Sequence, residues 1–148
     1  MKFKLKPIEK KWILYDIGNS AFALLISTIM PIYFNYLAGD AGISEVNYLA
    51  YWGYATSAAT VIVAVLGPLL GTVSDAAGRK KKIFMIALLA GALGCVFLGF
   101  MQSWIWFLLL FVFAKSAYSL SLVICDSMLT DITSEERMDE VSAQGYAW

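Results

Sequence analysis

Histidine is absent from this chain of 148 residues, and cysteine occurs only twice, at Cys95 and Cys125. Zinc sites need several cysteine, histidine or carboxylate ligands, and a disulfide framework needs several cysteines. Both cysteines lie inside apolar segments. We therefore expect no metal site, no cofactor and no disulfide framework within one chain.

Charge is also scarce. Hydrophobic residues make up 60% of the chain and charged residues 15%, with eleven Lys and Arg balanced by eleven Asp and Glu. This composition leaves too little polar surface for a soluble domain of this length. A net charge of zero also argues against nucleic acid as a partner, because neutralising phosphates requires an excess of basic side chains.

Long uncharged runs fill the space between the few charges. They cover 23 residues from Ile17 to Gly39, 29 from Val46 to Ser74 and 32 from Ile83 to Ala114. A helix needs about 20 apolar residues to cross the core of a bilayer, so each run is long enough. The sequence therefore predicts an integral membrane protein surrounded by lipid.

The run lengths predict an all-α transmembrane fold. The segment Ile83–Cys125 carries a single charge, and one helix of that length would be about 65 Å long, so it must contain two spans. The polar break between them falls at residues 99–103. We predict membrane helices at about 12–36, 48–74, 83–100 and 104–126, and the first turn of a fifth helix from about residue 141.

The positions of the cations predict the orientation of these helices. Five lysines precede the first span and four cations occupy Arg79–Lys82, whereas the turns at 39–47 and 99–103 have none. The positive-inside rule then places the amino terminus and the basic turn in the cytoplasm. We expect an integral protein of a bacterial plasma membrane. The first apolar run is too long for a cleaved signal peptide, so we expect it to remain as a helix.

The basic turn carries the most informative motif. Gly71, Asp75, Gly78, Arg79 and Lys80 form a Gly-x-x-x-Asp-x-x-Gly-Arg-Lys pattern between two apolar spans. This pattern resembles the signature of the major facilitator superfamily of secondary transporters. A metal-dependent membrane enzyme would need several carboxylates here, and the turn has one carboxylate followed by four cations, so we expect no enzyme activity.

The same motif continues a row of small residues. Gly67, Gly71 and Asp75 recur every four residues and share one face of the second span. Such a face lets another helix approach the backbone closely, so we predict a packing seam at the two glycines. For Asp75 we favour a role in gating.

Polar residues inside the spans are candidates for a solute cavity. Lys115 lies near the middle of the fourth span, where an ammonium costs about 2.5–3.5 kcal/mol, so it should face a wet cavity or an acid. Substrate-anion binding and proton coupling both suit it. Asp16 and Asn19, one turn inside the first span, either line the cytoplasmic mouth of this cavity or cap and bridge neighbouring helices.

Further segments resemble one branch of the superfamily, which contains bacterial carriers of unknown substrate and autophagy-related vacuolar amino-acid effluxers of fungi. Residues 12–23 with 31–34 are similar to its first helix, residues 51–75 to its second, and residues 126–132 to its fourth-helix exit. That exit usually begins with Asn and has Pro at its fifth position. This chain has Asp126 and Thr130 there instead.

The resemblance implies a fold of twelve helices in two bundles that rock about a central site. It also implies a latch between the bundles, in which Asp75 contacts the opposing bundle and Arg79 pairs with an acid at the fourth helix, here Asp126. Residues 1–148 would then be an incomplete amino-terminal bundle, completed by missing carboxy-terminal helices or another chain.

Three interpretations follow from the sequence. The first is the amino-terminal portion of a carrier that moves a small solute, an amino acid for example, by alternating access. The second is a self-contained four-helix membrane protein with a structural or assembly role. The third is an inactive truncation, which sequence chemistry does not distinguish from the first.

Overall fold

The computed structural model describes residues 6–76, 79–133, 141 and 143, and the regular elements in these ranges are all helical. Four helices are long and apolar enough to cross a membrane, at Pro7–Asp40, Glu45–Ser74, Lys80–Leu98 and Trp104–Leu129. The predicted fold class is therefore confirmed. Most of the predicted fifth helix lies outside the described residues.

The first span consists of three consecutive segments, α1 (Pro7–Leu24), η1 (Leu25–Ile29) and α2 (Met30–Asp40). Pro7 is suited to the first turn because the N–H that it lacks would have no partner there. The segment η1 is a π-helix, which the sequence analysis did not predict. Pro31 has no N–H to donate to the backbone carbonyl of Ser27, and its ring crowds that carbonyl. The helix therefore widens just before Pro31.

The remaining spans are α3 (Glu45–Ala76), α4 (Lys80–Leu98) and α5 (Trp104–Ile132). Gly42 closes α2 with a φ of 72°, a left-handed conformation that favours glycine. The N–H of Gly42 binds the carbonyl of Gly39 and that of Ile43 binds the carbonyl of Ala38, which is the Schellman pattern. The chain can therefore reverse tightly between the first and second spans.

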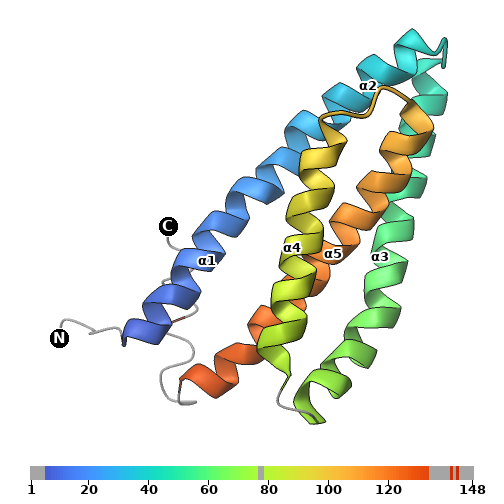
Figure 1. Cartoon of the computed structure of the whole chain (residues 1–148). Helices are drawn as coiled ribbons and strands as arrows, with labels where there is room; N and C mark the ends of the chain where they lie inside the picture. The colour runs from blue at the N-terminus through green and yellow to red at the C-terminus, as the bar shows by residue number, and fades with distance from the viewer. Residues whose placement is uncertain (1–5, 77–78, 134–140, 142, 144–148) are drawn as a thin grey trace.

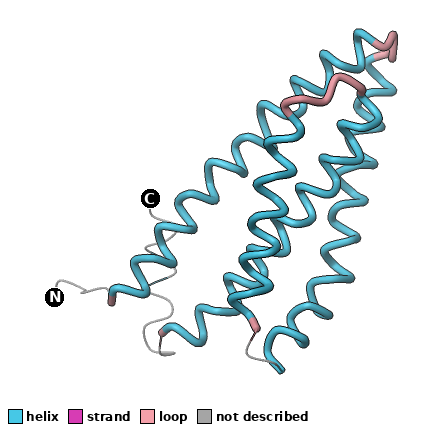
Figure 2. Tube along the Cα trace, in the orientation of Figure 1, coloured by secondary structure: helices cyan, strands magenta, loops and turns pink. Residues whose placement is uncertain are grey.

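The spans run alternately up and down, and the described turns lie at the two ends of the bundle (Figures 1 and 2). Helix α5 is central, since it packs against α1, α2, α3 and α4. In the most apolar stretch of α5, 44% of the residues are buried inside the protein. In the corresponding stretch of α3, 11% are buried. Much of α3 is therefore left to contact lipid or further protein.

The tightest packing joins α4 to α5 along a seam that we call the glycine seam, made by Gly91 and Gly94 against Ala114 and Tyr118. A Cβ atom added at Gly94 would lie 2.8 Å from the Cβ of Ala114, and one at Gly91 would lie 3.3 Å from the backbone N of Tyr118. Small residues allow this approach of two backbones. At Gly67 and Gly71, by contrast, an added Cβ would have no atom within 4 Å, so no described helix fills the seam predicted there.

Two clusters of buried side chains close the ends of the bundle. Near the α2–α3 turn, aromatic rings stack between spans, with 6.0 Å between the rings of Phe34 and Phe107 and 4.3 Å between those of Trp52 and Phe111. At the other end a smaller cluster contains Trp12, Ile13, Cys125, Leu129 and Val141. Val141 follows α5 in the chain and packs in this cluster with Trp12 and Ile13 of α1.

Candidate functional site

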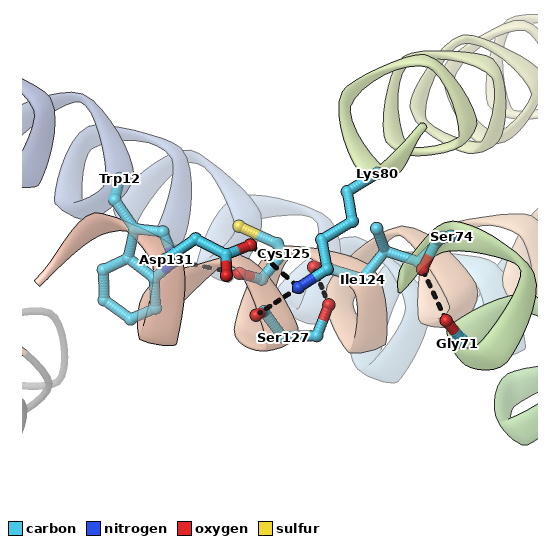
Figure 3. Close-up of polar contacts among 8 residues, drawn as sticks. All are labelled: Trp12, Gly71, Ser74, Lys80, Ile124, Cys125, Ser127 and Asp131. Carbon is cyan, nitrogen blue, oxygen red and sulfur yellow. Dashed lines mark hydrogen bonds and ion pairs between the residues drawn. The ribbon is translucent and has the colours of Figure 1, made fainter. Parts of the chain in front are cut away.

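The basic turn between α3 and α4 is held against the end of α5. Lys80, the first residue of α4, places its Nζ 2.8 Å from the Oδ2 of Asp131 and 3.4 Å from the backbone O of Ser127 (Figure 3). The side chain of Lys80 is 18% exposed and that of Asp131 57%. The pair is therefore half in water and stabilises the contact only modestly.

Local hydrogen bonds shape the approach to this turn. Ser74 is buried, and its hydroxyl donates to the carbonyl of Gly71 at 2.8 Å. The N–H of Arg79 then donates to the carbonyl of Ser74 at 3.2 Å. These bonds bring the chain round from α3 so that Lys80 starts α4 beside α5.

The structure differs in detail from the predicted latch. Arg79 and Asp126 are both exposed, and they form no ion pair with each other in the described part of the chain. The recorded link uses the next cation, Lys80, and an acid five residues further along, Asp131. The side chain of Asp75 and the whole of Gly78 lie outside the described residues, so their predicted roles stay predictions.

Hydrogen bonds between α1 and α5 form a ladder at the same end of the bundle. The indole N–H of Trp12 donates to the carbonyl of Cys125 at 3.2 Å (Figure 3). The hydroxyls of Tyr15 and Ser121 are 3.0 Å apart. One step further in, the hydroxyl of Tyr118 donates to the backbone carbonyl of Asn19 at 3.1 Å. The ladder fixes the register of the first and fourth spans.

Two predicted site residues lie on the helices that this ladder joins. Asp16 of α1 is half-buried, and Asp126 of α5 is exposed and follows Cys125, whose carbonyl accepts the bond from Trp12. Neither carboxylate forms an ion pair with another described residue. Their roles in a cavity and in a latch therefore stay predictions.

Lys115 is half-buried in the middle of α5. Asp126 follows it by eleven residues on the same helix, about 16 Å away along the axis, so the two charges do not pair. Ser116, the next residue, is buried, and its hydroxyl has no hydrogen-bond partner among the described residues. The middle of α5 therefore contains polar groups whose partners are not supplied by the described helices.

Glu9 is a buried acid that the sequence analysis missed. Its carboxylate accepts a hydrogen bond from the backbone N–H of Lys6 at 2.6 Å and one from the hydroxyl of Thr133 at 3.1 Å. Pro7 followed two residues later by an acid is a typical helix start, and this signal could have identified Glu9 as a capping residue. Its bond to Thr133, at the end of α5, depends on the tertiary fold.

No group of three or more metal-binding side chains comes together among the residues that were described. The site described here thus consists of the Lys80–Asp131 ion pair and several hydrogen bonds at one end of the bundle, with Lys115 deeper in the membrane. Such a set can hold helices in one relative position and release them. It can also attract a charged solute.

Comparison with known proteins assigns the family. The model of the Major Facilitator Superfamily matches residues 16–144. The chain is 40% identical over 141 residues to the "Uncharacterized MFS-type transporter YxiO" of Bacillus subtilis (strain 168), covering 93% of this chain and 33% of that protein. The chain thus spans about a third of the length of this curated relative. No solved structure matches it. The chain belongs to the major facilitator superfamily.

Proposed function

We propose that the chain is the amino-terminal part of a secondary transporter that moves a small solute across a bacterial plasma membrane by alternating access. The observation that carries the proposal is the superfamily match along nearly the whole chain, combined with its coverage of only 33% of the relative. The chain contributes four spans, and further helices complete the pathway. The amino terminus and the basic turn face the cytoplasm.

The contacts of the basic turn support a latch at this end. The bond between Lys80 and Asp131 ties the turn to α5, so a movement of α5 is transmitted to α3 and α4. In this proposal Asp75 and Arg79 face the part of the transporter that the chain does not contain. Their charges stabilise one of the two states between which the carrier rocks.

The polar groups of α1 and α5 support a solute cavity. Lys115 attracts an anionic group, and the acids Asp16 and Asp126 attract a cation or a proton. A zwitterionic amino acid carries both signs, which makes amino acids the solute class that we propose. Proton coupling through one of these acids is part of the same proposal.

Asp75→Ala in the full-length transporter tests the latch. Removing the charge should change the rate of solute uptake into proteoliposomes several-fold while leaving the amount of folded protein in the membrane nearly unchanged. Asp40→Ala is the matched control, because Asp40 is an exposed acid at the opposite end of the bundle. Equal uptake by both variants and the parent protein would count against the latch.

A further inference from the structure

An open groove lies between α1 and α4, with α5 as its floor. Its larger part is a cavity of about 570 Å³ at the end of the bundle where α1 and α4 begin (Figure 1). Pockets that bind small molecules have volumes of about 300–1,000 Å³, so this cavity has room for a ligand. A smaller cavity of about 250 Å³ adjoins it, and Tyr15 lines both. We call the two cavities together the α1–α4 groove.

Two lysines line the larger cavity, one from each wall. Lys11 belongs to α1 and Lys81 to α4, and both residues are exposed. The described residues that line this cavity include no acid. Neither ammonium forms an ion pair within residues 6–76 and 79–133. The outer part of the groove therefore carries two positive charges that the described helices do not neutralise.

The groove becomes more apolar inward from these lysines. Met85, one turn after Lys81, lines the larger cavity and is 43% exposed. Gly18 and Leu88 line the smaller cavity, each seven residues after the lysine of its own helix, so the groove continues about 10 Å further along both walls. One leaflet contributes about 15 Å to the hydrocarbon core of a bilayer. The groove thus follows a large part of the depth of one leaflet.

The hydroxyls along the inner part of the groove already have partners within the protein. Tyr118 donates to the backbone carbonyl of Asn19, and Ser121 donates to that of Tyr118. Because Ser121 uses its own proton in this way, it accepts the hydrogen bond from the hydroxyl of Tyr15, 3.0 Å away. These three hydroxyls need no partner from an occupant, so an apolar chain can lie against them.

Charge and depth together favour an anionic phospholipid as the occupant. A free phosphate would neutralise the two lysines but would leave Met85 and Leu88 uncovered. A zwitterionic phospholipid would cover them but would also bring an ammonium of its own near the lysines. An anionic phospholipid such as phosphatidylglycerol supplies a phosphate without a compensating cation, and it supplies acyl chains in the same molecule.

We propose that the α1–α4 groove binds one anionic phospholipid. Its phosphate lies between Lys11 and Lys81, and one acyl chain runs inward past Met85 toward Gly18. This site goes beyond the proposed function, because the lipid is a component of the membrane that is held and not transported. It requires no particular solute.

Lipid titration of the 148-residue chain tests the site. The chain is purified in a nonionic detergent, and native mass spectrometry measures the affinity for the first bound phosphatidylglycerol. Phosphatidylcholine with the same acyl chains is the zwitterionic reference. Lys11→Gln combined with Lys81→Gln removes both charges from the groove. Lys10→Gln combined with Lys82→Gln is the matched control, because these exposed lysines are neighbours in the same two helices and do not line the groove.

The parent chain should bind phosphatidylglycerol more tightly than phosphatidylcholine. Each lysine near an anionic headgroup strengthens binding about fivefold, so the two groove substitutions together should lower the affinity for phosphatidylglycerol about 25-fold. The affinity for phosphatidylcholine should stay nearly unchanged, and the control pair should cost less than about fivefold. Equal losses for the two pairs, or equal affinities of the parent chain for the two lipids, would overturn the proposal.

Two further measurements distinguish a lipid from a soluble anion. Glycerol 3-phosphate has the charged part of the lipid without its chains, so it should not displace phosphatidylglycerol. Met85→Ser removes an apolar contact at an exposed position and should weaken phosphatidylglycerol binding several-fold. Leu89→Ser is the matched control, since Leu89 is 55% exposed on α4 and does not line the groove. Displacement by glycerol 3-phosphate, or equal affinities of the two serine variants, would contradict a lipid site.

Discussion

The two sides of α5 differ in how completely they are packed. On one side the glycine seam brings the backbones of α4 and α5 together, so that no Cβ fits at Gly94 without a shift of Ala114. On the other side α1 is joined to α5 by a ladder of hydrogen bonds and leaves open a groove between α1 and α4, lined by Tyr15, Gly18, Asn19 and Leu88. The α4–α5 pair is thus closely packed, whereas α1 has one face that no described residue covers.

The difference shows which contacts this chain can complete by itself. A glycine seam depends only on the two helices that form it, and both are present. The face of α1 that meets the groove has Gly18, where an added Cβ would have no atom within 4 Å, next to the polar Asn19. Stability should therefore be sensitive to substitutions in the seam and tolerant of them in the groove.

The largest expected effect comes from Gly94→Leu compared with Gly18→Leu, measured on the 148-residue chain in detergent. The leucine at 94 must displace Ala114, and overpacking of this kind costs about 1–3 kcal/mol. The leucine at 18 enters open space and should leave the midpoint of thermal unfolding nearly unchanged or slightly higher. Because both substitutions replace glycine by leucine in a helix, their intrinsic helix propensities cancel in the comparison.

A second substitution shows whether the clash is local. Ala114→Gly removes the atom nearest to the new side chain, so Gly94→Leu combined with Ala114→Gly should recover part of the lost stability. Equal losses for Gly94→Leu and Gly18→Leu would mean that the two sides of α5 are packed alike.

A smaller loss of thermal stability is expected from Tyr118→Phe, which weakens the hydrogen-bond ladder between α1 and α5. The substitution removes the hydroxyl bonded to Asn19 but keeps the ring, which lies 3.9 Å from that of Phe22. Interhelical hydrogen bonds in membranes contribute about 0.6 kcal/mol on average. Tyr54→Phe is the matched control, since Tyr54 is exposed on α3. If Tyr118→Phe lowered the thermal stability as much as Gly94→Leu, the packing of α1 on α5 would depend on the hydrogen-bond ladder far more than we propose.

The spans could be predicted from the sequence because membrane helices are set by length and charge. The break near residues 99–103 followed from the length of the apolar segment, and α4 indeed ends at Leu98 while α5 begins at Trp104. The π-helical segment could not be placed in this way, because Pro31 predicts a local disturbance without specifying how the helix absorbs it. The start at Pro7 was missed because the lysines around it hide the helix signal.

The site was harder to predict because it depends on register between helices. Rows of small residues occur at Gly67 and Gly71 and again at Gly91 and Gly94, and the sequence does not say which row meets a neighbour within this chain. The structure places the close contact at the second row. The register of α4 on α5 then brings Lys80 to Asp131, a pair that the sequence analysis did not predict.

The smallest expected effect comes from Lys80→Gln, which breaks the ion pair that holds the basic turn on α5. Because Asp131 is more than half exposed, the loss of stability should be about 0.3 kcal/mol, and it should shrink as salt is added. Lys82→Gln is the matched control, since Lys82 is an exposed lysine of the same turn. The informative measurement is the salt dependence of thermal unfolding, which should differ between Lys80→Gln and the parent chain and not between Lys82→Gln and the parent chain. Identical salt dependence for both variants would mean that the Lys80–Asp131 ion pair does not help to hold the turn on α5, and that the close packing of α4 on α5 rests on the glycine seam.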